Sequence, residues 1–176
     1  MTTRRAFLVV ATAFVLMGVE KPPSARAHSE IPDGSTIVLV RHADKMSGQG
    51  DVALSPAGMK RRDALMEVLK NSSLSVIVRT NALRSKETTK LIADKLKLVP
   101  VEIKRSSTEQ NDMEQAVRAN LPGVALVVGH SETLPGLIEA LGGPNVEVNT
   151  FDNLFVIVRA RGVTQFIRGR YGAASN

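Results

Sequence analysis

The sequence has no cysteine and no tryptophan, and it has a single tyrosine among its 176 residues. The absence of cysteine excludes disulfide bonds, zinc sites built from thiolates and a cysteine nucleophile. Aromatic residues make up only 3% of the chain, and no run of the sequence alternates basic with aromatic residues. Nucleic-acid-binding surfaces often show such a run together with a strong basic excess, so nucleic acid is not expected as a partner.

Charge and hydrophobicity are those of an ordinary globular protein, with 43% hydrophobic and 23% charged residues. The formal net charge is +6, but residues 1–27 hold four basic residues and one acidic residue, which leaves 19 basic and 16 acidic residues in the remainder. The remaining excess of positive charge is modest. It suits a site for a small anionic substrate better than a surface for a polyanion.

Residues 1–27 have the pattern of a secretory signal peptide. Arg4 and Arg5 precede an apolar run of 14 residues, 6–19, and Ala25-Arg26-Ala27 forms a cleavage site. This run is shorter than the roughly 20 residues that span a bilayer. We therefore expect export, with cleavage after Ala27 and a periplasmic location, and an N-terminal membrane anchor is the alternative. The paired arginines also resemble a twin-arginine signal.

Beyond a loose lead-in at residues 28–34, apolar runs of strand type alternate with helical patterns. The predicted strands are 36–41, 74–78, 99–103 and 124–128, followed by a hairpin of 153–159 and 163–168. The predicted helices are 56–71, 82–97, 112–120 and 134–141. Strands that alternate with helices predict an α/β fold, a three-layer α/β/α sandwich with a mainly parallel central sheet and a C-terminal antiparallel hairpin. A single domain therefore spans residues 35–176.

Two of the predicted helices have recognisable starts. Ser55 is a good N-cap and Pro56 a good first residue for the first helix, and Asn81 is a candidate cap for the second. In the first helix, Arg61 and Arg62 are expected to face solvent. Its apolar face is expected to consist of four residues: Leu65, Met66, Val68 and Leu69.

Polar groups follow three of the predicted parallel strands. Arg41 and His42 end the first strand, Thr80 ends the second with Arg84 one helical turn later, and His130 follows the fourth. In an open α/β sheet, ligands bind outside the carboxyl ends of the strands, so these groups are expected to share one crevice. Two guanidiniums and two imidazoles repel one another unless an anion lies among them, and a phosphoryl group matches the guanidinium fork.

His42 is the better nucleophile of the two histidines because it directly follows a rigid strand, and imidazole can form a covalent intermediate. A phosphohistidine would divide hydrolysis into transfer to His42 and attack by water. Arg41, Arg84 and His130 would then offset the charge on the transferred group. This chemistry requires no metal ion or other cofactor, and the acidic cluster of a magnesium site is not evident in the sequence.

Four short motifs, in order along the chain, resemble those of the histidine phosphatase superfamily, also called phosphoglycerate mutase-like. The strand motif Arg-His-Gly is similar to Arg41-His42-Ala43, and Leu-Thr-x-x-Gly is similar to residues 54–58. The Ser-x-x-x-Arg-x-x-x-Thr motif is similar to residues 80–88, and the late Gly-His motif is similar to Gly129-His130. The resemblance covers residues 35–171, and a small exported bacterial branch fits best.

The resemblance implies that His42 is the phosphorylated nucleophile, and that Arg41, Arg84 and His130 form the phosphate pocket. Large mutases of the family carry their acidic proton donor in a long insertion after the third strand, whereas this chain has only residues 105–112 there. The proton-donor candidates are Asp44, which is two residues from His42, then Glu109 in the short loop, and Glu132. Asp44 is preferred on sequence alone, although its cationic neighbours should lower its pKa.

Thr80 and Ser131 are further candidates to bind substrate, and Ser131 and Thr133 are also candidates to cap the following helix. The predicted function is a metal-independent phosphomonoesterase that acts through a phosphohistidine on an extracytoplasmic phosphorylated small molecule or glycolipid. The alternative is a non-catalytic protein of the same fold that binds phosphate or a phosphorylated ligand. Mutase activity is a lesser possibility, because the short loops would hold a phosphorylated intermediate poorly while it reorients.

Overall fold

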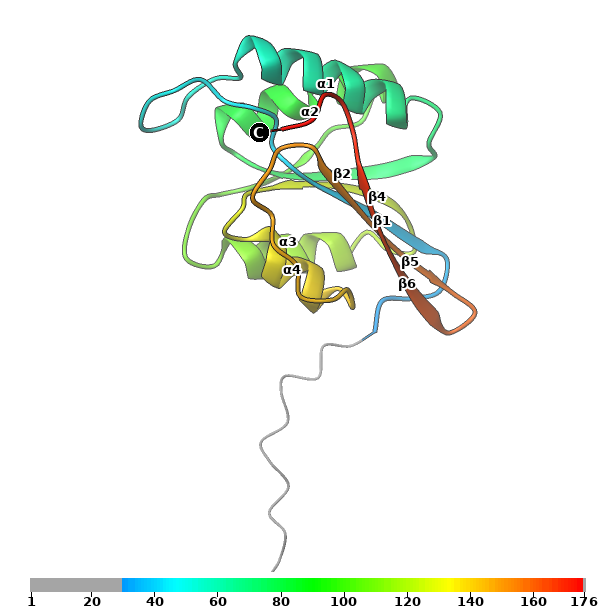
Figure 1. The fold of residues 1–176 in the computed structure, drawn as a ribbon. Coiled ribbons are helices and arrows are strands. Elements are labelled where there is room, and N and C mark those ends of the chain that lie inside the picture. The colour runs from blue at the N-terminus through cyan, green and yellow to red at the C-terminus, as the bar shows by residue number, and fades with distance from the viewer. Residues whose placement is uncertain (1–29, 176) are drawn as a thin grey trace, which may run out of the picture.

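A computed structural model describes residues 30–175 of the chain (Figure 1). The predicted signal peptide, residues 1–27, lies outside the described residues. Between residues 30 and 175, no helix combines the length and the apolar character that crossing a membrane requires. The described residues form one sheet with helices on both faces.

The six strands and four helices follow the predicted order. The strands are β1 (Ser35–Arg41), β2 (Leu74–Thr80), β3 (Val101–Ile103), β4 (Gly123–Gly129), β5 (Asn153–Ala160) and β6 (Val163–Arg170). The helices are α1 (Pro56–Leu69), α2 (Leu83–Leu96), α3 (Glu109–Arg118) and α4 (Leu134–Ala140). The predicted α/β class, with a C-terminal antiparallel hairpin, is confirmed.

The sheet has the strand order β3-β2-β4-β1-β5-β6. β1, β2, β3 and β4 are parallel, whereas β5 runs antiparallel to β1 and β6 runs antiparallel to β5. The register places Arg41 of β1 opposite Gly129 of β4. The residues that follow these two strands, His42 and His130, therefore leave the sheet at the same level of its carboxyl edge.

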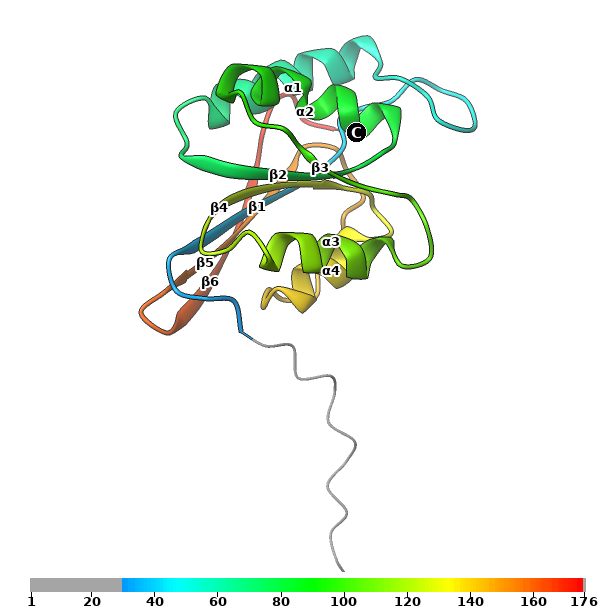
Figure 2. The ribbon, with the colours of Figure 1, turned by 180° about the vertical axis from the view of Figure 1, so that it is seen from behind.

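Helices cover both faces of the parallel part of the sheet. α1 and α2 lie on one face, and α3 and α4 lie on the other (Figures 1 and 2). Successive residues of a strand point to opposite faces, so β1 contributes Val38 and Val40 to one core and Ile37 and Leu39 to the other. All four side chains are buried. The apolar run that predicted the strand is thus explained by burial on both sides.

The first helix begins as predicted, but one of its faces differs from the prediction. Ser55 is the N-cap, and its Oγ accepts a hydrogen bond from the N–H of Gly58 at 3.1 Å. Val68, expected to face the core, is 55% exposed. Arg61, expected to face solvent, is only 4% exposed. The turn of α1 that carries Arg61 faces acceptors contributed by the C-terminal residues, which a local pattern does not reveal.

The second helix also begins differently from the prediction. Its N-cap is Ala82, which makes no side-chain cap hydrogen bond. Asn81 instead accepts a hydrogen bond on Oδ1 from the backbone N–H of Arg105 at 3.1 Å. This bond joins the end of β2 to the loop after β3, so Asn81 links two loops at the carboxyl edge of the sheet.

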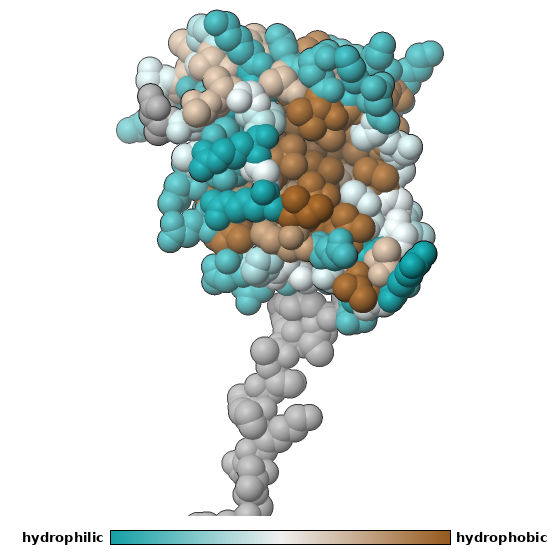
Figure 3. Space-filling model, turned by 45° about the vertical axis from the view of Figure 1, so that its right-hand side comes forward, coloured by the Kyte–Doolittle hydropathy of each residue, from teal (hydrophilic) through white to brown (hydrophobic). Residues whose placement is uncertain are grey.

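The β5–β6 hairpin extends beyond the helices and leaves one sheet face partly uncovered. Leu154, Val156 and Val158 of β5 lie on this face and are half-buried, and Ile167 of β6 pairs with Val156 and is exposed. Figure 3 shows an apolar area on the side of the molecule where this hairpin lies. The exposed character of β6 follows from its position at the edge of the sheet.

Candidate active site

His42 leaves the carboxyl end of β1 and is 3% exposed. Its backbone N–H donates to the carbonyl oxygen of Gly129 at 3.0 Å, which continues the pairing of β1 with β4 by one residue. Its ring Nδ1 lies 2.8 Å from the carbonyl oxygen of Ala43. A carbonyl can only accept, so Nδ1 carries the hydrogen and the lone pair of the neutral ring is on Nε2. The side chain is therefore held in the tautomer that a nucleophile at Nε2 requires.

Both backbone polar groups of Ala43 are hydrogen-bonded. Its carbonyl accepts from His42, and its N–H donates to Oγ1 of Thr88 at 2.9 Å. The Thr88 hydroxyl in turn donates to the carbonyl oxygen of Arg84 at 2.7 Å. The loop after the strand is thus bonded to α2 one turn beyond Arg84, which explains physically why an arginine and a threonine four residues apart belong to one site.

The start of α1 packs directly against the backbone of Asp44. The N–H of Ser55 donates to the carbonyl oxygen of Asp44 at 2.9 Å. A Cβ at Gly58 would lie only 2.0 Å from the same oxygen, so no larger residue fits there without a shift. The glycine of the Leu-x-x-x-Gly motif therefore permits the helix to approach the loop that holds His42.

Two guanidiniums flank the histidine. Arg41 donates from one terminal nitrogen to the carbonyl oxygen of Asn149 at 3.0 Å, and its guanidinium carbon lies 4.1 Å from the ring centre of Phe151. Arg84 is buried and lies 3.6 Å from Oδ1 of Asp51. The Nε atoms of both arginines are buried and have no hydrogen-bond partner within residues 30–175. Buried unpaired donors are costly, so this arrangement favours an anion as the missing acceptor.

His130 lies beside His42, with the two ring centres 5.1 Å apart, and it is 1% exposed. Its Nε2 is 2.9 Å from Oγ1 of Thr80, and the Thr80 hydroxyl donates to Oγ of Ser85. Since that hydroxyl hydrogen is used, Nε2 of His130 is the donor and Nδ1 has the lone pair. Nδ1 is buried without a hydrogen-bond partner among the described residues.

Both histidines have strongly lowered pKa values. Burial lowers the pKa of His42 to about 4, the hydrogen bond to Ala43 opposes this, and the charges of Arg84 and Arg41 lower it further. Burial also lowers the pKa of His130 to about 3, with added repulsion from Arg105, His42 and Arg84. Both rings are consequently neutral at neutral pH, so His42 is available as a nucleophile.

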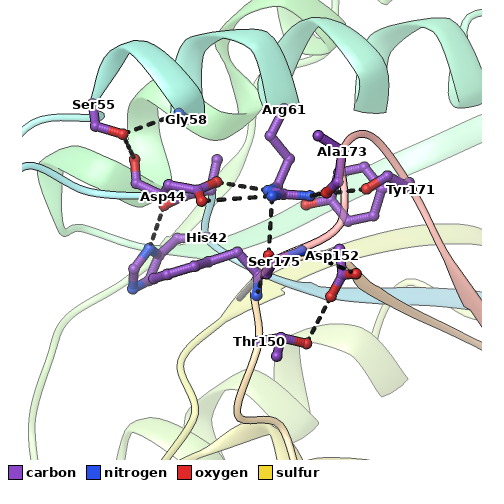
Figure 4. A network of polar contacts seen from close by, with 12 residues as sticks. His42, Asp44, Ser55, Gly58, Arg61, Thr150, Asp152, Tyr171, Ala173 and Ser175 are labelled. Carbon is purple, nitrogen blue, oxygen red and sulfur yellow. Dashed lines mark hydrogen bonds and ion pairs between the residues drawn. The ribbon is translucent and has the colours of Figure 1, made fainter.

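Asp44, a candidate proton donor, is bonded to the buried Arg61. Nε of Arg61 donates to Oδ2 of Asp44 at 2.6 Å, and a terminal nitrogen lies 3.5 Å from Oδ1 (Figure 4). The structure thus places Asp44 next to the catalytic loop but pairs it with Arg61.

Glu109, the alternative donor, is the first residue of α3 rather than a loop residue. It is buried, and its Oε1 has no hydrogen-bond partner within the described part of the chain. Burial raises its pKa, although Arg105 at 3.3 Å and a hydrogen bond from Thr133 oppose this. A buried carboxyl with a raised pKa is suited to holding a proton.

Glu132 and Arg105 complete the charged rim of the site. Arg105 donates to Oε1 of Glu132 at 2.9 Å, and the charge of Glu132 acts on Arg41, His42, Arg84 and His130. Burial raises the pKa of Glu132, but hydrogen bonds and the neighbouring positive groups outweigh burial and leave it lowered. Glu132 is therefore an anion at neutral pH.

Arg105 and Phe151 were not predicted as site residues from the sequence. Arg105 lies beside Arg84 at a cleft of about 360 Å³ whose other lining residues are Gly50, Asp51, Asn81 and Ala82. Its position after the third strand is the same signal that identified the other site residues. Phe151 reaches His42, at 5.6 Å between ring centres, from a loop more than 100 positions away, and no local pattern predicts that contact.

The remaining predicted residues have supporting positions. Thr80 is fully buried and contacts His130 rather than open space. The Ser131 hydroxyl donates to the adjacent Glu132. Thr133 is at the N-cap position of α4 but makes no side-chain cap bond to that helix, so the predicted side-chain cap is wrong. Its Oγ1 instead accepts from the N–H of His130 at 3.4 Å.

Metal ligands are not gathered near these groups. Residues 30–175 contain no group of three or more His, Asp or Glu side chains arranged to hold a metal ion. The cationic side of the site is supplied by arginines. The arrangement can hold an oxyanion against a neutral imidazole whose Nε2 has a lone pair.

Residues 37–114 match the family model described as the histidine phosphatase superfamily (branch 1). This stretch, 78 of the 176 residues, is therefore similar to the histidine phosphatase superfamily. The matched stretch includes His42, Arg84 and Glu109, and His130 lies beyond it. No curated protein matches the chain.

Solved structures extend the structural likeness over most of the length of the chain. The protein histidine phosphatase SixA, complexed with tungstate, is 16% identical with a TM-score of 0.58, over 77% of this chain and 96% of that one. The alpha-ribazole phosphatase of Shigella flexneri is 15% identical with a TM-score of 0.55, over 80% and 100%. The phosphoglycerate mutase of Plasmodium falciparum is 19% identical with a TM-score of 0.52, over 82% and 94%. These likenesses establish a shared fold.

Proposed function

We propose that this protein is a metal-independent phosphomonoesterase that uses His42 as its nucleophile. The observation that carries the proposal is the hydrogen bond from Nδ1 of His42 to Ala43, which leaves the Nε2 lone pair of a neutral ring beside two guanidiniums with unpaired Nε donors. A neutral imidazole held in this tautomer can attack phosphorus without first losing a proton.

In the first step, the lone pair of Nε2 forms a bond to phosphorus while the bond from phosphorus to the leaving oxygen breaks. The ring becomes a phosphorylated imidazolium whose Nδ1–H remains bonded to the Ala43 carbonyl, so that carbonyl stabilises the positive charge. The leaving oxygen takes a proton from a carboxylic acid of the site. Arg41 and Arg84 offset negative charge on the phosphoryl oxygens, as guanidiniums do in phosphoryl transfer.

In the second step, water attacks the phosphohistidine and phosphate is released. The carboxylate formed in the first step accepts a proton from this water, and Nε2 of His42 recovers its lone pair. His130 contributes its Nδ1 edge to the same pocket. Binding of a dianion there would raise the pKa of His130 and favour a protonated Nδ1 that donates to the phosphoryl oxygen.

Glu109 is proposed as the carboxylic acid in preference to Asp44. Burial raises the pKa of Glu109 and favours its protonated form, whereas Asp44 is paired with the guanidinium of Arg61. Glu109 has an unpaired oxygen that can carry the proton. Glu132 is the weaker candidate because its pKa is lowered, so at neutral pH it has no proton to donate.

The proposed independence from metal rests on what the arginines supply. Arg41 and Arg84 provide the positive charge that a bound magnesium ion would otherwise provide, and their guanidiniums add planar hydrogen-bond donors. The substrate is proposed to be a phosphorylated small molecule or glycolipid outside the cytoplasm, since residues 1–27 have the pattern of an export signal. A protein of similar fold, the protein histidine phosphatase SixA, is complexed with the oxyanion tungstate, which supports an oxyanion as the ligand.

The second candidate function is binding of a phosphorylated ligand without turnover. The ion pair of Asp44 with Arg61 favours it, because this pair engages one of the three candidate proton donors. A substrate whose leaving group needs no proton distinguishes the two functions. A chromogenic aryl phosphate is such a substrate.

The decisive experiment incubates the purified protein with an aryl phosphate and chelator at pH 5 to 7. We expect turnover, and we expect an acid-labile, base-stable phosphoryl label that disappears in His42→Ala. Binding of phosphate without turnover would favour the binding protein. Labelling that persists in His42→Ala would exclude His42 as the nucleophile.

A further inference from the structure

The buried Arg61 lies outside the phosphate pocket and makes more hydrogen bonds than any role on a helix surface requires. One of its terminal nitrogens donates to the carbonyl oxygens of Tyr171 at 2.9 Å and Ala173 at 2.8 Å. The other donates to Oγ of Ser175 at 3.0 Å. Together with the bond from Nε to Asp44, these contacts connect α1 to two other parts of the chain, the second of them through the C-terminal residues (Figure 4).

The first of these parts is the loop that holds the nucleophile. Asp44 directly follows Ala43, whose carbonyl oxygen holds Nδ1 of His42. Arg61 bonds the side chain of Asp44, and Ser55, the N-cap of α1, bonds its backbone. The start of α1 therefore contacts this residue at two points. A change at Arg61 would therefore affect His42 through Asp44 and Ala43.

The second part is the loop before β5. Oγ of Ser175 accepts from the backbone N–H of Phe151 at 3.2 Å as well as from Arg61. The neighbouring Asp152 is buried, and its carboxylate accepts from Arg170 at 2.6 Å and from the backbone N–H of Ser175 at 3.4 Å. The C-terminal residues are thus bonded to the loop that carries Phe151.

Phe151 packs against His42 and Arg41 of the proposed phosphate pocket. Its ring centre lies 5.6 Å from that of His42 and 4.1 Å from the guanidinium carbon of Arg41. Its contact helps keep His42 away from water, and it fixes the plane of a guanidinium proposed to bind the substrate. The position of Phe151 therefore matters to both the nucleophile and the anion site.

We propose that Arg61 and the C-terminal segment 171–175 form a positioning unit for this reaction, in which Arg61 holds the His42 loop through Asp44 and the Phe151 loop through Ser175. The inference rests on the proposed function of His42. It adds that the last residues of the chain are part of the catalytic apparatus, although none of them contacts the substrate. Arg61 is a positioning residue in this scheme.

The test compares Ser175→Ala, Arg61→Lys and a chain ending at Gly172 with wild type, and Arg62→Ala is the matched control. Arg62 lies on the same helix and donates to the adjacent Asp63. With an aryl phosphate, we expect kcat to fall about fivefold in Ser175→Ala, which removes the hydrogen bonds from Arg61 and from the N–H of Phe151. We expect a larger fall in the shortened chain, and KM should change less than kcat. Arg62→Ala should behave as wild type.

A second measurement separates positioning from stability and from the proposed function. The ring of His42 is titrated by NMR in each variant, which requires no turnover. The charged and titratable groups that act on His42 are Arg41, Arg84, His130 and Glu132, and none of them is altered in these variants. If Phe151 is released, water reaches His42 and its pKa rises toward the value of a free histidine.

The outcomes are distinct. A raised pKa of His42 in Ser175→Ala and in the shortened chain, with midpoints of thermal unfolding within a few degrees of wild type, supports the positioning unit. Unchanged kcat and unchanged titration in both variants would overturn it. If wild type lacks turnover, the proposed function fails, and the titration alone still decides whether the C-terminal segment positions His42.

Discussion

Nδ1 of His42 donates to the carbonyl oxygen of Ala43 at 2.8 Å, so the ring of the proposed nucleophile is oriented by the residue that directly follows it. The N–H of that residue is bonded to Thr88 on α2. Because the carbonyl oxygen and the N–H of Ala43 are both hydrogen-bonded, the ring of His42 has a defined direction before any substrate binds. Preorganisation of this kind lowers the reorganisation that a reaction requires.

Thr88→Val should reduce kcat about tenfold, because it removes the bond that holds the Ala43 peptide and leaves a buried N–H unpaired. Thr88→Ser keeps the hydroxyl and should retain most of the activity. Thr89→Val is the matched control, since the Thr89 hydroxyl bonds to carbonyl oxygens of its own helix, those of Ser85 and Lys86. Steady-state kinetics with an aryl phosphate measures the difference. Equal losses in Thr88→Val and Thr89→Val would contradict a specific role for Thr88.

Gly58→Ala should lower the free energy of unfolding by about 1–3 kcal/mol, as overpacking usually does, and reduce activity as the Asp44 backbone is displaced. The added Cβ would lie 2.0 Å from the carbonyl oxygen of Asp44. Gly136→Ala is the control, because its Cβ would meet the flexible end of the Gln110 side chain, which can move. Urea denaturation and kinetics on both variants test this. A larger loss in Gly136→Ala would refute the explanation.

The two histidines should make the folded protein less stable in mild acid. In the unfolded chain a histidine has a pKa of about 6.5, whereas in the folded protein the pKa is about 4 for His42 and about 3 for His130. Below pH 6.5 the unfolded state therefore binds protons that the folded state does not, so stability falls as the pH is lowered, until about pH 4 for His42 and about pH 3 for His130. Above pH 7 both states are neutral at these residues, so neither ring contributes.

Urea denaturation between pH 8 and pH 4.5 measures this effect. Asp152, whose pKa is lowered to about 2 by hydrogen bonds from Thr150 and Arg170 that outweigh burial, loses its contribution at lower pH and does not dominate that window. His42→Gln and His130→Gln should each make the dependence on pH less steep. A dependence on pH that is equally steep in wild type and in both variants would rule out the lowered pKa values.

Glu109→Gln should slow hydrolysis of an alkyl phosphate, which needs a proton on its leaving oxygen, by about 10²-fold or more. The same variant should retain most of its rate on an aryl phosphate. Because Glu109 must be protonated to act and burial raises its pKa, the wild-type rate on the alkyl phosphate should fall as pH rises through that pKa. The variant should lose this fall.

Asp44→Asn is the informative comparison for the donor. It keeps the shape of the side chain but removes the negative charge that pairs with Arg61. A loss confined to alkyl phosphates in Asp44→Asn, with Glu109→Gln unaffected, would assign the proton to Asp44. A loss on both kinds of substrate in Asp44→Asn would instead indicate positioning.

The chain order of strands and helices, and the residues at the strand ends, were predictable from sequence because they depend on short-range patterns. A buried strand such as β1 needs a continuous apolar run, and a parallel sheet brings its carboxyl ends to one edge. The sequence alone could therefore place four residues together: Arg41, His42, Arg84 and His130. The structure brings them together as expected, and their catalytic roles remain predictions.

Tertiary structure alone decided how each of these groups is held and charged. The sequence pattern of α1 places Arg61 among solvent-facing charges, yet Arg61 is buried because residues more than 100 positions later provide its acceptors. Phe151 reaches His42 in the same way. Burial and long-range contacts set pKa values, pairings and loop positions, and they depend on packing between segments that no local pattern relates. The sequence by itself determined which chemistry is present at the edge of the sheet, and the fold determined which of those groups are neutral, paired or free to act.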